Sequence, residues 1–331
     1  MDHILAKSPQ GQDRPGTENP LIHIDYDAVH RLAGGASLVA ALRLAFLAPG
    51  ISPERAHYDL ETQGAARSLL VMPSWRPDRG IGVKIVTVFP DNARQGLPSV
   101  NAAYVLLSWQ TGQPLAWIDG RALTLIRTAA VSALAADLLA PAKPEVLLMV
   151  GTGALSSHLI QAHTAVRPYQ SVLVWGRDPA KAAAVAGDLT ARGCPAAAAT
   201  DLEAAARSAD VISCATLAEA PLIQGSWLKP DCHLDLVGSF RPAMREADDT
   251  CLRGAFIAVD TLAALDDSGD LQGPLARGVI ARQEVQTLSA LLSRKECVAR
   301  PRRTVFKTVG VALADLAVAE HLYQRHKLAG G

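Results

Sequence analysis

The middle of the chain carries the pattern that most constrains its fold. The stretch EVLLMVGTGALSSHLIQAHTA (145–165) is an apolar run, a glycine turn and a segment with helical spacing, and residues 171–193 repeat that order. Further apolar runs follow in DVISCAT (210–216), HLDLVGS (233–239) and AFIAVD (255–260). Apolar strands that alternate with helices are typical of a parallel sheet covered on both faces. This region therefore predicts a Rossmann-type, doubly wound α/β domain.

The regions on either side predict a second domain. Residues 67–120 hold apolar runs broken by Pro and Gly (SLLVMPSW, GIGVKIVTVF, AAYVLLSW), and GQPLAWIDG indicates a hairpin return. One amphipathic helix is expected over residues 27–47 in spite of two adjacent glycines, and another over residues 122–139. Residues 304–326 begin as an extended segment and then become an amphipathic helix.

These patterns predict an inserted domain and a tail. Residues 128–303 are expected to form the dinucleotide-binding domain, with a helix over 283–292 near its end. Residues 21–127 and 304–331 are expected to form a second, α+β domain, in which the last helix returns to the N-terminal part. Residues 1–20 predict a flexible tail. Such an insertion places the cleft between two domains, which is a common location for a small-molecule site.

Composition argues against several classes of function. Lys+Arg and Asp+Glu both total 32, so the balanced charge favours neither a nucleic-acid partner nor an anionic membrane surface. No apolar run reaches the about 18 residues of a membrane span, and the N-terminus lacks a signal-peptide core. The five cysteines form no CxxC pair, and the nine histidines show no ligand spacing. We therefore expect a cytoplasmic protein with reduced thiols and no metal site.

The turn GTGALS is a candidate dinucleotide site. Gly151 would permit a tight turn, and Gly153 would let the backbone approach a pyrophosphate at the N-terminus of the next helix. Alone the motif is weak and could be a mere strand-to-helix turn, but its place inside a strand–helix repeat favours a dinucleotide. The other cofactor-binding candidates lie in the same loop and at the end of DVISCAT: Thr152, Ala154, Leu155 and Thr216.

The end of the second apolar run, VWGRD, favours NADPH. An NAD-selective site usually has an acid about 20 residues past the glycine motif, and this chain has Gly176 there, followed by Arg177. A glycine does not repel a 2′-phosphate, and a guanidinium can pair with one. Asp178 is an alternative ribose ligand if the register is shifted by two residues. NADH is therefore expected to be the weaker cofactor.

Three basic residues stand out before residue 128. Lys84 is a lone charge in an apolar strand pattern, and because an unpaired buried ammonium is costly, it indicates either a structural ion pair or a ligand-binding role. Arg127 lies near the start of an apolar helix, where an arriving anion would explain a cation that the helix dipole disfavours. Arg55 lies in ISPERAHY. Taken alone, these residues leave structural and functional roles open.

Several segments, in order from about residue 50 to residue 322, resemble the ornithine cyclodeaminase/μ-crystallin family. They are VMPSW with GVKIV, GQPLAWIDGRALTLIRTAAVSALAADLLA, VGTGALSSHLI, VGSFRPAMRE and TVFKTVGVALADLAVAE. The resemblance implies two domains, a homodimer formed through the N-terminal domain, and a nicotinamide cofactor. It also implies that Arg55, Lys84 and Arg127 hold the substrate carboxylate and the adjacent nitrogen or carbonyl.

The segment VGSFRPAMRE bears on the reaction. Cyclodeaminase-like members of the family carry an aspartate where this chain has Ser239, and a serine hydroxyl cannot act as a carboxylate base. The Ser-x-x-Pro pattern that ends at Pro242 is similar to the ketimine-reductase branch. Ser239 is expected to contact both cofactor and substrate, where it could hydrogen-bond the substrate nitrogen or order a water; alternatively, it only caps the strand. Thr308 could face the substrate or cap the last helix, and Asp315 is expected to be structural.

Together these features predict an NADPH-dependent reductase of small cyclic ketimine carboxylates. Δ1-pyrroline-2-carboxylate would give L-proline, and Δ1-piperideine-2-carboxylate would give L-pipecolate. Lys84 would stabilise the carboxylate or supply a proton, and Ser239 would assist at the nitrogen. The alternatives are other chemistry of the family (ornithine or lysine cyclodeamination, alanine dehydrogenation, N-alkyl amino-acid formation) and a non-catalytic protein that holds NADPH and a small ligand.

Overall fold

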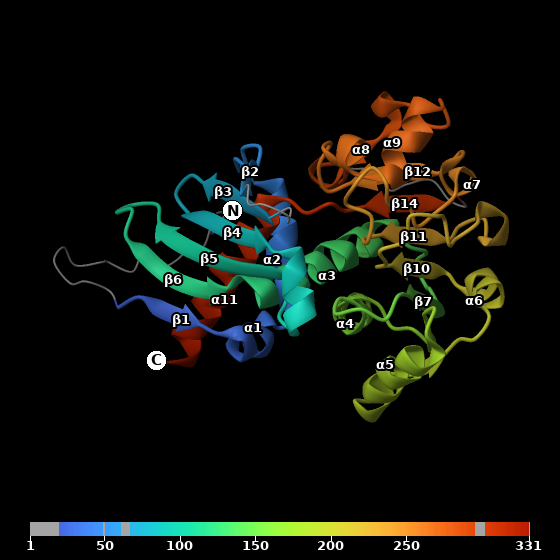
Figure 1. The fold of residues 1–331 in the computed structure, drawn as a ribbon, viewed down its shortest axis with the longest axis horizontal. Helices are drawn as coiled ribbons and strands as arrows, with labels where there is room; N and C mark the ends of the chain where they lie inside the picture. Colours follow the sequence, from blue (N-terminus) through green and yellow to red (C-terminus); the bar gives the residue numbers. More distant parts are fainter. Residues whose placement is uncertain (1–19, 49, 61–66, 295–301, 331) are drawn as a thin grey trace, which may run out of the picture.

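A computed structural model describes residues 20–48, 50–60, 67–294 and 302–330. It contains two domains that lie side by side, with one long helix between them (Figure 1). The predicted flexible tail, apart from Pro20, lies outside the described residues, as does Cys297. The four described cysteines are free thiols, and three of them are buried.

The first domain is built on a six-stranded sheet with the strand order β1-β6-β5-β4-β3-β2. Its strands are β1 (Ile22–Ile24), β2 (Ala56–Leu60), β3 (Arg67–Arg76), β4 (Gly80–Val88), β5 (Val100–Ser108) and β6 (Pro114–Asp119). Neighbouring strands are antiparallel, except that β1 runs parallel to β6. The hairpin return that GQPLAWIDG predicts is the β5–β6 pair. The two edge strands carry no apolar pattern that could be recognised, because β1 has only three residues and β2 (AHYDL) is mostly exposed.

Helices α1 (Tyr26–Ala33) and α11 (Ala312–Ala329) pack on this sheet, and α2 (Ala36–Leu47) packs on α11. The single helix predicted over 27–47 is wrong, because the chain bends by 87° between α1 and α2. Gly34 has φ 71°, a left-handed conformation that ends α1. Helix α11 contacts β3, β4, α1 and α2, so the last helix returns to the N-terminal part as predicted.

The second domain is built on an eight-stranded parallel sheet with the order β13-β12-β14-β11-β10-β7-β8-β9. Its strands are β7 (Val146–Val150), β8 (Ser171–Trp175), β9 (Ala196–Ala198), β10 (Val211–Cys214), β11 (His233–Leu236), β12 (Phe256–Val259), β13 (Gln286–Thr287) and β14 (Thr304–Lys307). The order reverses between β7 and β10, so the predicted doubly wound fold is confirmed.

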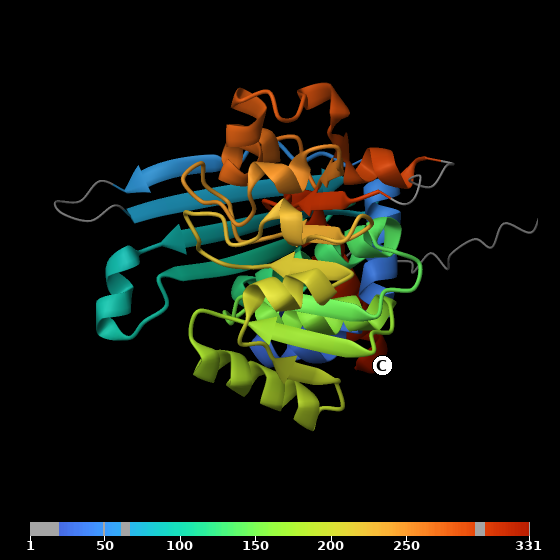
Figure 2. The same cartoon turned by 90° about the vertical axis from the view of Figure 1, so that its right-hand side faces the viewer.

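Helices accompany this parallel sheet, as the continuous apolar strands require. They are α4 (Ser156–Val166), α5 (Pro179–Ala191), α6 (Leu202–Ser208), α7 (Asp249–Leu252), α8 (Ala264–Asp267), α9 (Gly269–Ala276) and α10 (Leu288–Leu292). Figure 2 shows α5, in yellow-green, at one side of the sheet and α8 and α9, in orange, at the other. The central strands are buried along their whole length.

Two predictions about the end of this domain are wrong. Strand β14 pairs with β11 and β12, so the predicted boundary before residue 304 falls too early, and the chain leaves the sheet after Lys307. The apolar run TVFK is fully buried because it lies between two strands. The helix predicted over 283–292 is only α10, since Thr287 caps it by accepting a hydrogen bond from the Ala290 N–H at 3.2 Å.

Helix α3 (Gly120–Leu139) lies between the two sheets and contacts elements of both (Figure 1). It is long and apolar enough to span a membrane by length and composition, but 78% of its most apolar window is buried inside the protein. Its apolar side chains pack in the core between α1, α2, α4 and α11. The helix thus carries Arg127 to the region where the two domains meet.

Candidate active site

A cleft of about 430 Å³ lies at the carboxyl ends of β7, β8 and β10, where the strand order reverses. The predicted residues Gly151, Thr152 and Gly153 line it. Gly151 has φ 123°, and a Cβ there would lie 2.5 Å from the carbonyl oxygen of Ala215. No atom lies within 4 Å of the Cβ position of Gly153, so the backbone is open to a ligand at that point.

The start of α4 fits a pyrophosphate. The residue before it, Leu155, gives no side-chain cap to the first turn, so an anion can satisfy N–H groups there. Ser156 takes the place of a third glycine, and its hydroxyl donates to the carbonyl of Gly151 at 2.9 Å, which stabilises the turn. The residues present therefore fit a dinucleotide. Of the other predicted loop residues, Leu155 lines an adjoining cavity and Ala154 lines neither.

The far end of the cleft is lined by Gly176, Arg177 and Asp178. A Cβ at residue 176 would lie 2.7 Å from Thr152 Cγ2, so an acidic side chain there would require Thr152 to move. Arg177 is exposed and pairs with no acid of the described chain. Asp178 caps α5, where its Oδ1 accepts hydrogen bonds from two backbone N–H groups. Thr216 lines the same cleft, at the end of β10.

Two cavities lie between this cleft and the six-stranded sheet. One has a volume of about 320 Å³, and Arg55, Lys84 and Arg127 all line it. Its wall is otherwise mostly apolar: Leu70, Met72, Val86, Val100, Ala102, Leu125 and Val309. The second cavity, of about 190 Å³, shares Arg127 and Val309 with the first, and it includes Leu155 of the glycine turn. The structure thus brings the three predicted cations together beside the dinucleotide cleft.

Lys84 and Arg127 share one buried carboxylate. Asp315 Oδ1 lies 3.1 Å from Lys84 Nζ and 3.0 Å from Arg127 Nε, and Asp315 is fully buried. Burial lowers the pKa of Lys84 from 10.5 to about 8, although attraction to Asp315 opposes this shift. Two cations therefore meet one anion, which leaves positive charge for an anionic ligand. Asp315 was expected to be structural. Its position beside both cations was not predicted.

Thr308, which was predicted to bind substrate, lines the smaller cavity. It is not the cap of the last helix, because α11 begins after Val311, which provides no side-chain cap. The Thr308 hydroxyl instead donates to Asp260 Oδ2 at 2.7 Å.

Asp260 was not predicted, and it shapes the loop that follows β14. It also accepts hydrogen bonds from the N–H groups of Val309 and Gly310, at 3.2 and 2.7 Å. Burial raises the pKa of Asp260, while these bonds lower it. A Cβ at Gly310 would lie 2.7 Å from the Arg127 guanidinium nitrogens, so the loop packs directly on Arg127. An acid that directly follows an apolar strand is the sequence signal that could have identified it.

Arg55 links the two domains. It lines the larger cavity, and its Nη2 lies 2.5 Å from Oδ2 of Asp267 in α8. Because about a third of each side chain is exposed, this pair contributes little to stability. Arg121, in the first turn of α3, is a further cation at the cavity that the sequence analysis did not identify.

The structure does not bring Ser239 to the cavities. Ser239 is fully buried, and its hydroxyl lies 2.7 Å from both the carbonyl oxygen of Met244 and the hydroxyl of Ser268. The predicted contacts of this hydroxyl with a substrate nitrogen and a cofactor do not fit that position. The next residue, Phe240, lines the smaller cavity and is 48% exposed. The end of β11 therefore presents an aromatic ring to the site.

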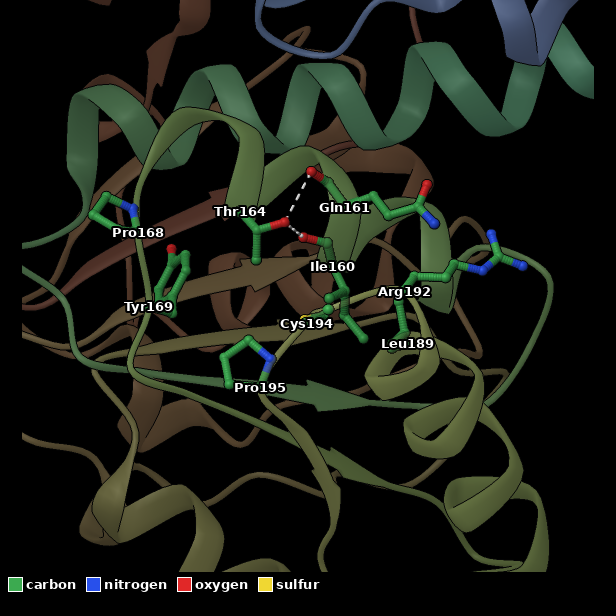
Figure 3. Close-up of a pocket in the computed structure, with 10 residues that line it drawn as sticks. Ile160, Gln161, Thr164, Pro168, Tyr169, Leu189, Arg192, Cys194 and Pro195 are labelled. Atoms are coloured by element: carbon green, nitrogen blue, oxygen red, sulfur yellow. Dashed lines mark hydrogen bonds between the residues drawn. The ribbon is translucent and has the colours of Figure 1, made fainter.

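A separate cavity of about 320 Å³ lies between the C-terminal parts of α4 and α5 (Figure 3). Gln161, Thr164, Tyr169, Arg192 and Cys194 are among its lining residues. It contains none of the predicted site residues. Its lining comes from the C-terminal parts of α4 and α5, whereas the glycine turn precedes the N-terminus of α4. Across the described ranges, no group of three His, Cys, Asp or Glu side chains could hold a metal ion.

A doubly wound sheet with a fitting glycine turn, beside a cationic cavity, defines a nicotinamide-dependent oxidoreductase. The chain belongs to the ornithine cyclodeaminase/mu-crystallin family, whose model matches residues 39–329. The resemblance seen in the sequence is thereby confirmed.

Three proteins with named activities match most of this chain. The chain is 34% identical, over 91% of its length and 98% of the relative, to a Δ1-pyrroline-2-carboxylate reductase of Colwellia psychrerythraea. Its fold matches the Thermococcus litoralis Δ1-pyrroline-2-carboxylate reductase in complex with NADH and L-proline, with a TM-score of 0.86 and 27% identity over 94% of this chain and 98% of that one. It also matches an archaeal alanine dehydrogenase dimer with bound NAD, with a TM-score of 0.85 and 25% identity over 94% and 97%.

Proposed function

We propose that this protein reduces small cyclic ketimine carboxylates with NADPH. Δ1-pyrroline-2-carboxylate would give L-proline, and Δ1-piperideine-2-carboxylate would give L-pipecolate. The observation that carries the proposal is the cluster of Arg55, Lys84 and Arg127 around a mostly apolar cavity next to the dinucleotide cleft. Cations suit the carboxylate, and apolar walls suit a small hydrocarbon ring. The named relatives support the same substrate class.

The chain's own side chains supply binding and proton handling. Arg127 has a planar guanidinium suited to two-point binding of a carboxylate. The bound dinucleotide would supply the hydride. The product amine requires that the imine nitrogen keep or gain one proton. Lys84, with a pKa of about 8, can hold or donate that proton near neutral pH.

The cavities also bear on the cyclodeaminase alternative. Among the described residues that line the two substrate-side cavities there is no Asp or Glu. Asp315 and Asp260 lie behind the lining and are engaged with Lys84, Arg127 and Thr308. In the part of the chain that the structure describes, no carboxylate is therefore placed to act as a base at a substrate amine, which favours the reductase. Ser239 itself does not distinguish the two reactions, because its hydroxyl is bonded to the carbonyl oxygen of Met244 and does not reach the cavities.

A substrate panel tests the proposal. NADPH oxidation is measured with both cyclic imines and with pyruvate plus ammonia or methylamine, and NAD-dependent turnover is measured with L-ornithine. We expect the highest kcat/KM with a cyclic imine. A higher value with pyruvate and an amine would assign the protein to alanine dehydrogenase or N-alkyl amino-acid chemistry. Tight NADPH binding without turnover of any compound would indicate a binding protein.

The cofactor preference is tested at Arg177. Arg177→Ala should weaken NADPH binding by about 1.5–3 kcal/mol, roughly ten- to a hundredfold, because a charge-assisted contact to the 2′-phosphate is lost. NADH binding should change little. Fluorescence titration with both cofactors measures the two Kd values, and Arg192→Ala, an exposed arginine at the other end of α5, is the control. Equal losses for NADPH and NADH would sink the assignment of Arg177.

The pKa of Lys84 predicts a pH dependence. If the ammonium is the active form, kcat/KM falls as the pH rises through about 8. Stability changes in the opposite direction. The folded-state pKa lies below the ordinary lysine value of 10.5, so burying the cation lowers the free energy of unfolding below about pH 8. That cost disappears as the pH rises toward 10.5.

The profile is measured for the wild type and for Lys84→Arg, whose guanidinium does not titrate in this range. The decline near pH 8 should be absent from the residual activity of the variant. An unchanged decline in Lys84→Arg would assign it to another group.

One face of the six-stranded sheet exposes apolar side chains that a second copy of the protein could cover. Tyr58, Ile85 and Trp117 are 53%, 37% and 41% exposed. The strand registers place all three on the face of the six-stranded sheet opposite Lys84. We infer that this apolar face joins two copies in a homodimer, in a cytoplasmic protein. The archaeal alanine dehydrogenase is itself a dimer, which supports the inference. Sedimentation of the wild type and of Ile85→Asp would test it, because the variant should be monomeric.

A further inference from the structure

Glu246 is a fully buried carboxylate that the proposed chemistry does not use. Its Oε1 accepts hydrogen bonds from the N–H and the hydroxyl of Thr216, at 2.7 and 2.9 Å. Its Oε2 accepts hydrogen bonds from the N–H groups of Gly238 and Ser239, at 2.7 and 3.3 Å. Each carboxylate oxygen therefore holds a different loop, one at the end of β10 and one at the end of β11.

These two loops border different parts of the candidate active site. Thr216 lines the dinucleotide cleft, whereas Val237 and Phe240 line the smaller substrate-side cavity. The loops also touch each other, since a Cβ at Gly238 would lie 2.1 Å from the carbonyl oxygen of Thr216. A small shift of either loop is therefore transmitted to the other through this contact and through Glu246.

Two further buried charges fix the position of Glu246. Asp270 Oδ1 accepts hydrogen bonds from the N–H groups of Glu246 and Ala247, at 2.8 and 3.2 Å. Lys307 Nζ lies 3.5 Å from Asp270 Oδ2, and both side chains are fully buried. Burial raises the pKa of Glu246 to about 7, while attraction to Lys307 lowers it and Asp270 raises it. The Glu246 carboxylate thus has a defined charge environment and four donors.

We propose that Glu246 is a positioning residue that holds the dinucleotide loop at Thr216 and the substrate-side loop at Gly238 in one fixed arrangement. The inference rests on the proposed function for the identity of the two ligands. Four donors converge on two oxygens, so a carboxylate satisfies all of them and a carboxamide cannot. In Glu246→Gln the amide NH₂ must face either Thr216 or the Gly238–Ser239 pair. Facing Thr216, it leaves the Thr216 N–H without an acceptor, although the hydroxyl can turn to accept from the NH₂; facing the pair, it leaves both N–H groups without an acceptor.

The test compares Glu246→Gln with Asp235→Asn. Asp235 is a second fully buried carboxylate, at β11, and it accepts hydrogen bonds from the hydroxyls of Ser132 and Ser213 at 3.0 and 2.7 Å. Neither serine lines the dinucleotide cleft or the substrate-side cavities. Both variants should lower the melting temperature. Only Glu246→Gln should raise the Kd for NADPH, by about tenfold, because at least one backbone N–H of a loop loses its buried acceptor.

The Kd is measured by fluorescence titration without substrate, so a failure of the reductase proposal does not affect it. Amide hydrogen exchange of the ligand-free proteins should show faster exchange at Thr216 or at Gly238 and Ser239 only in Glu246→Gln. If Glu246→Gln does not fold, Thr216→Val, which removes only the hydroxyl contact, should weaken NADPH about threefold. Wild-type NADPH affinity in the folded Gln variant, wild-type affinity in the Val variant, or equal weakening in Asp235→Asn would overturn the inference.

Discussion

Lys84→Met is expected to lower kcat/KM for cyclic imine reduction by about two to four orders of magnitude, the range for loss of a positioned acid–base group. The ammonium lies in the larger cavity and is only 3% exposed, so solvent does not readily replace it. The variant should fold, because Met has a similar shape and Asp315 keeps Arg127 as its partner. NADPH affinity should be unchanged, since Lys84 does not line the dinucleotide cleft.

Steady-state kinetics and NADPH titration together measure the effect of Lys84→Met. Lys327→Met, which removes an exposed lysine at the end of α11, is the control. A folded Lys84→Met protein with nearly normal kcat/KM would remove Lys84 from the reaction. Loss of folding in Lys84→Met would instead indicate that the pair with Asp315 is chiefly structural.

Asp315→Asn should affect both stability and catalysis. It leaves Lys84 and Arg127 buried near each other without their shared anion, which should lower the free energy of unfolding by about 3–5 kcal/mol. Attraction to Asp315 raises the pKa of Lys84, so its removal lowers that pKa further and reduces the cationic fraction at neutral pH. The decline of kcat/KM with rising pH should therefore move to lower pH.

Denaturant unfolding and a pH–rate profile test Asp315→Asn. Glu320→Gln is a matched control, because Glu320 lies on the same helix and pairs with Arg76 at 2.8 Å, away from the cavities. The control should lose less stability and should keep the wild-type pH profile. If Asp315→Asn keeps the wild-type profile, the carboxylate does not tune Lys84.

Much of the architecture was predictable because the residue patterns are local. Continuous apolar runs separated by helices predict a parallel sheet, and the glycine turn places the dinucleotide at its carboxyl edge. Lys84 and Arg127 were predictable because isolated charges in apolar segments need partners. Pattern alone could not place β14, a four-residue strand that enters the sheet between two strands from earlier in the chain.

The site residues that were predicted wrongly or not at all share a physical cause. Which of two adjacent residues faces a cleft depends on the path of the loop after a strand, and at the end of β11 that residue is Phe240 instead of Ser239. Asp315 and Asp260 act through side chains brought from distant parts of the chain, so their partners cannot be read from local spacing. Glu246 is a further case, since its two loops follow different strands.

Product analysis distinguishes a cyclic ketimine reductase from a cyclodeaminase. The wild-type protein is incubated with NADPH and Δ1-pyrroline-2-carboxylate, and L-proline and NADP⁺ are quantified together. In a parallel reaction with NAD and L-ornithine, released ammonia is quantified. We expect one L-proline for each NADPH oxidised and no ammonia above the enzyme-free background. Robust ammonia release from L-ornithine, or no L-proline from the imine, would contradict this expectation.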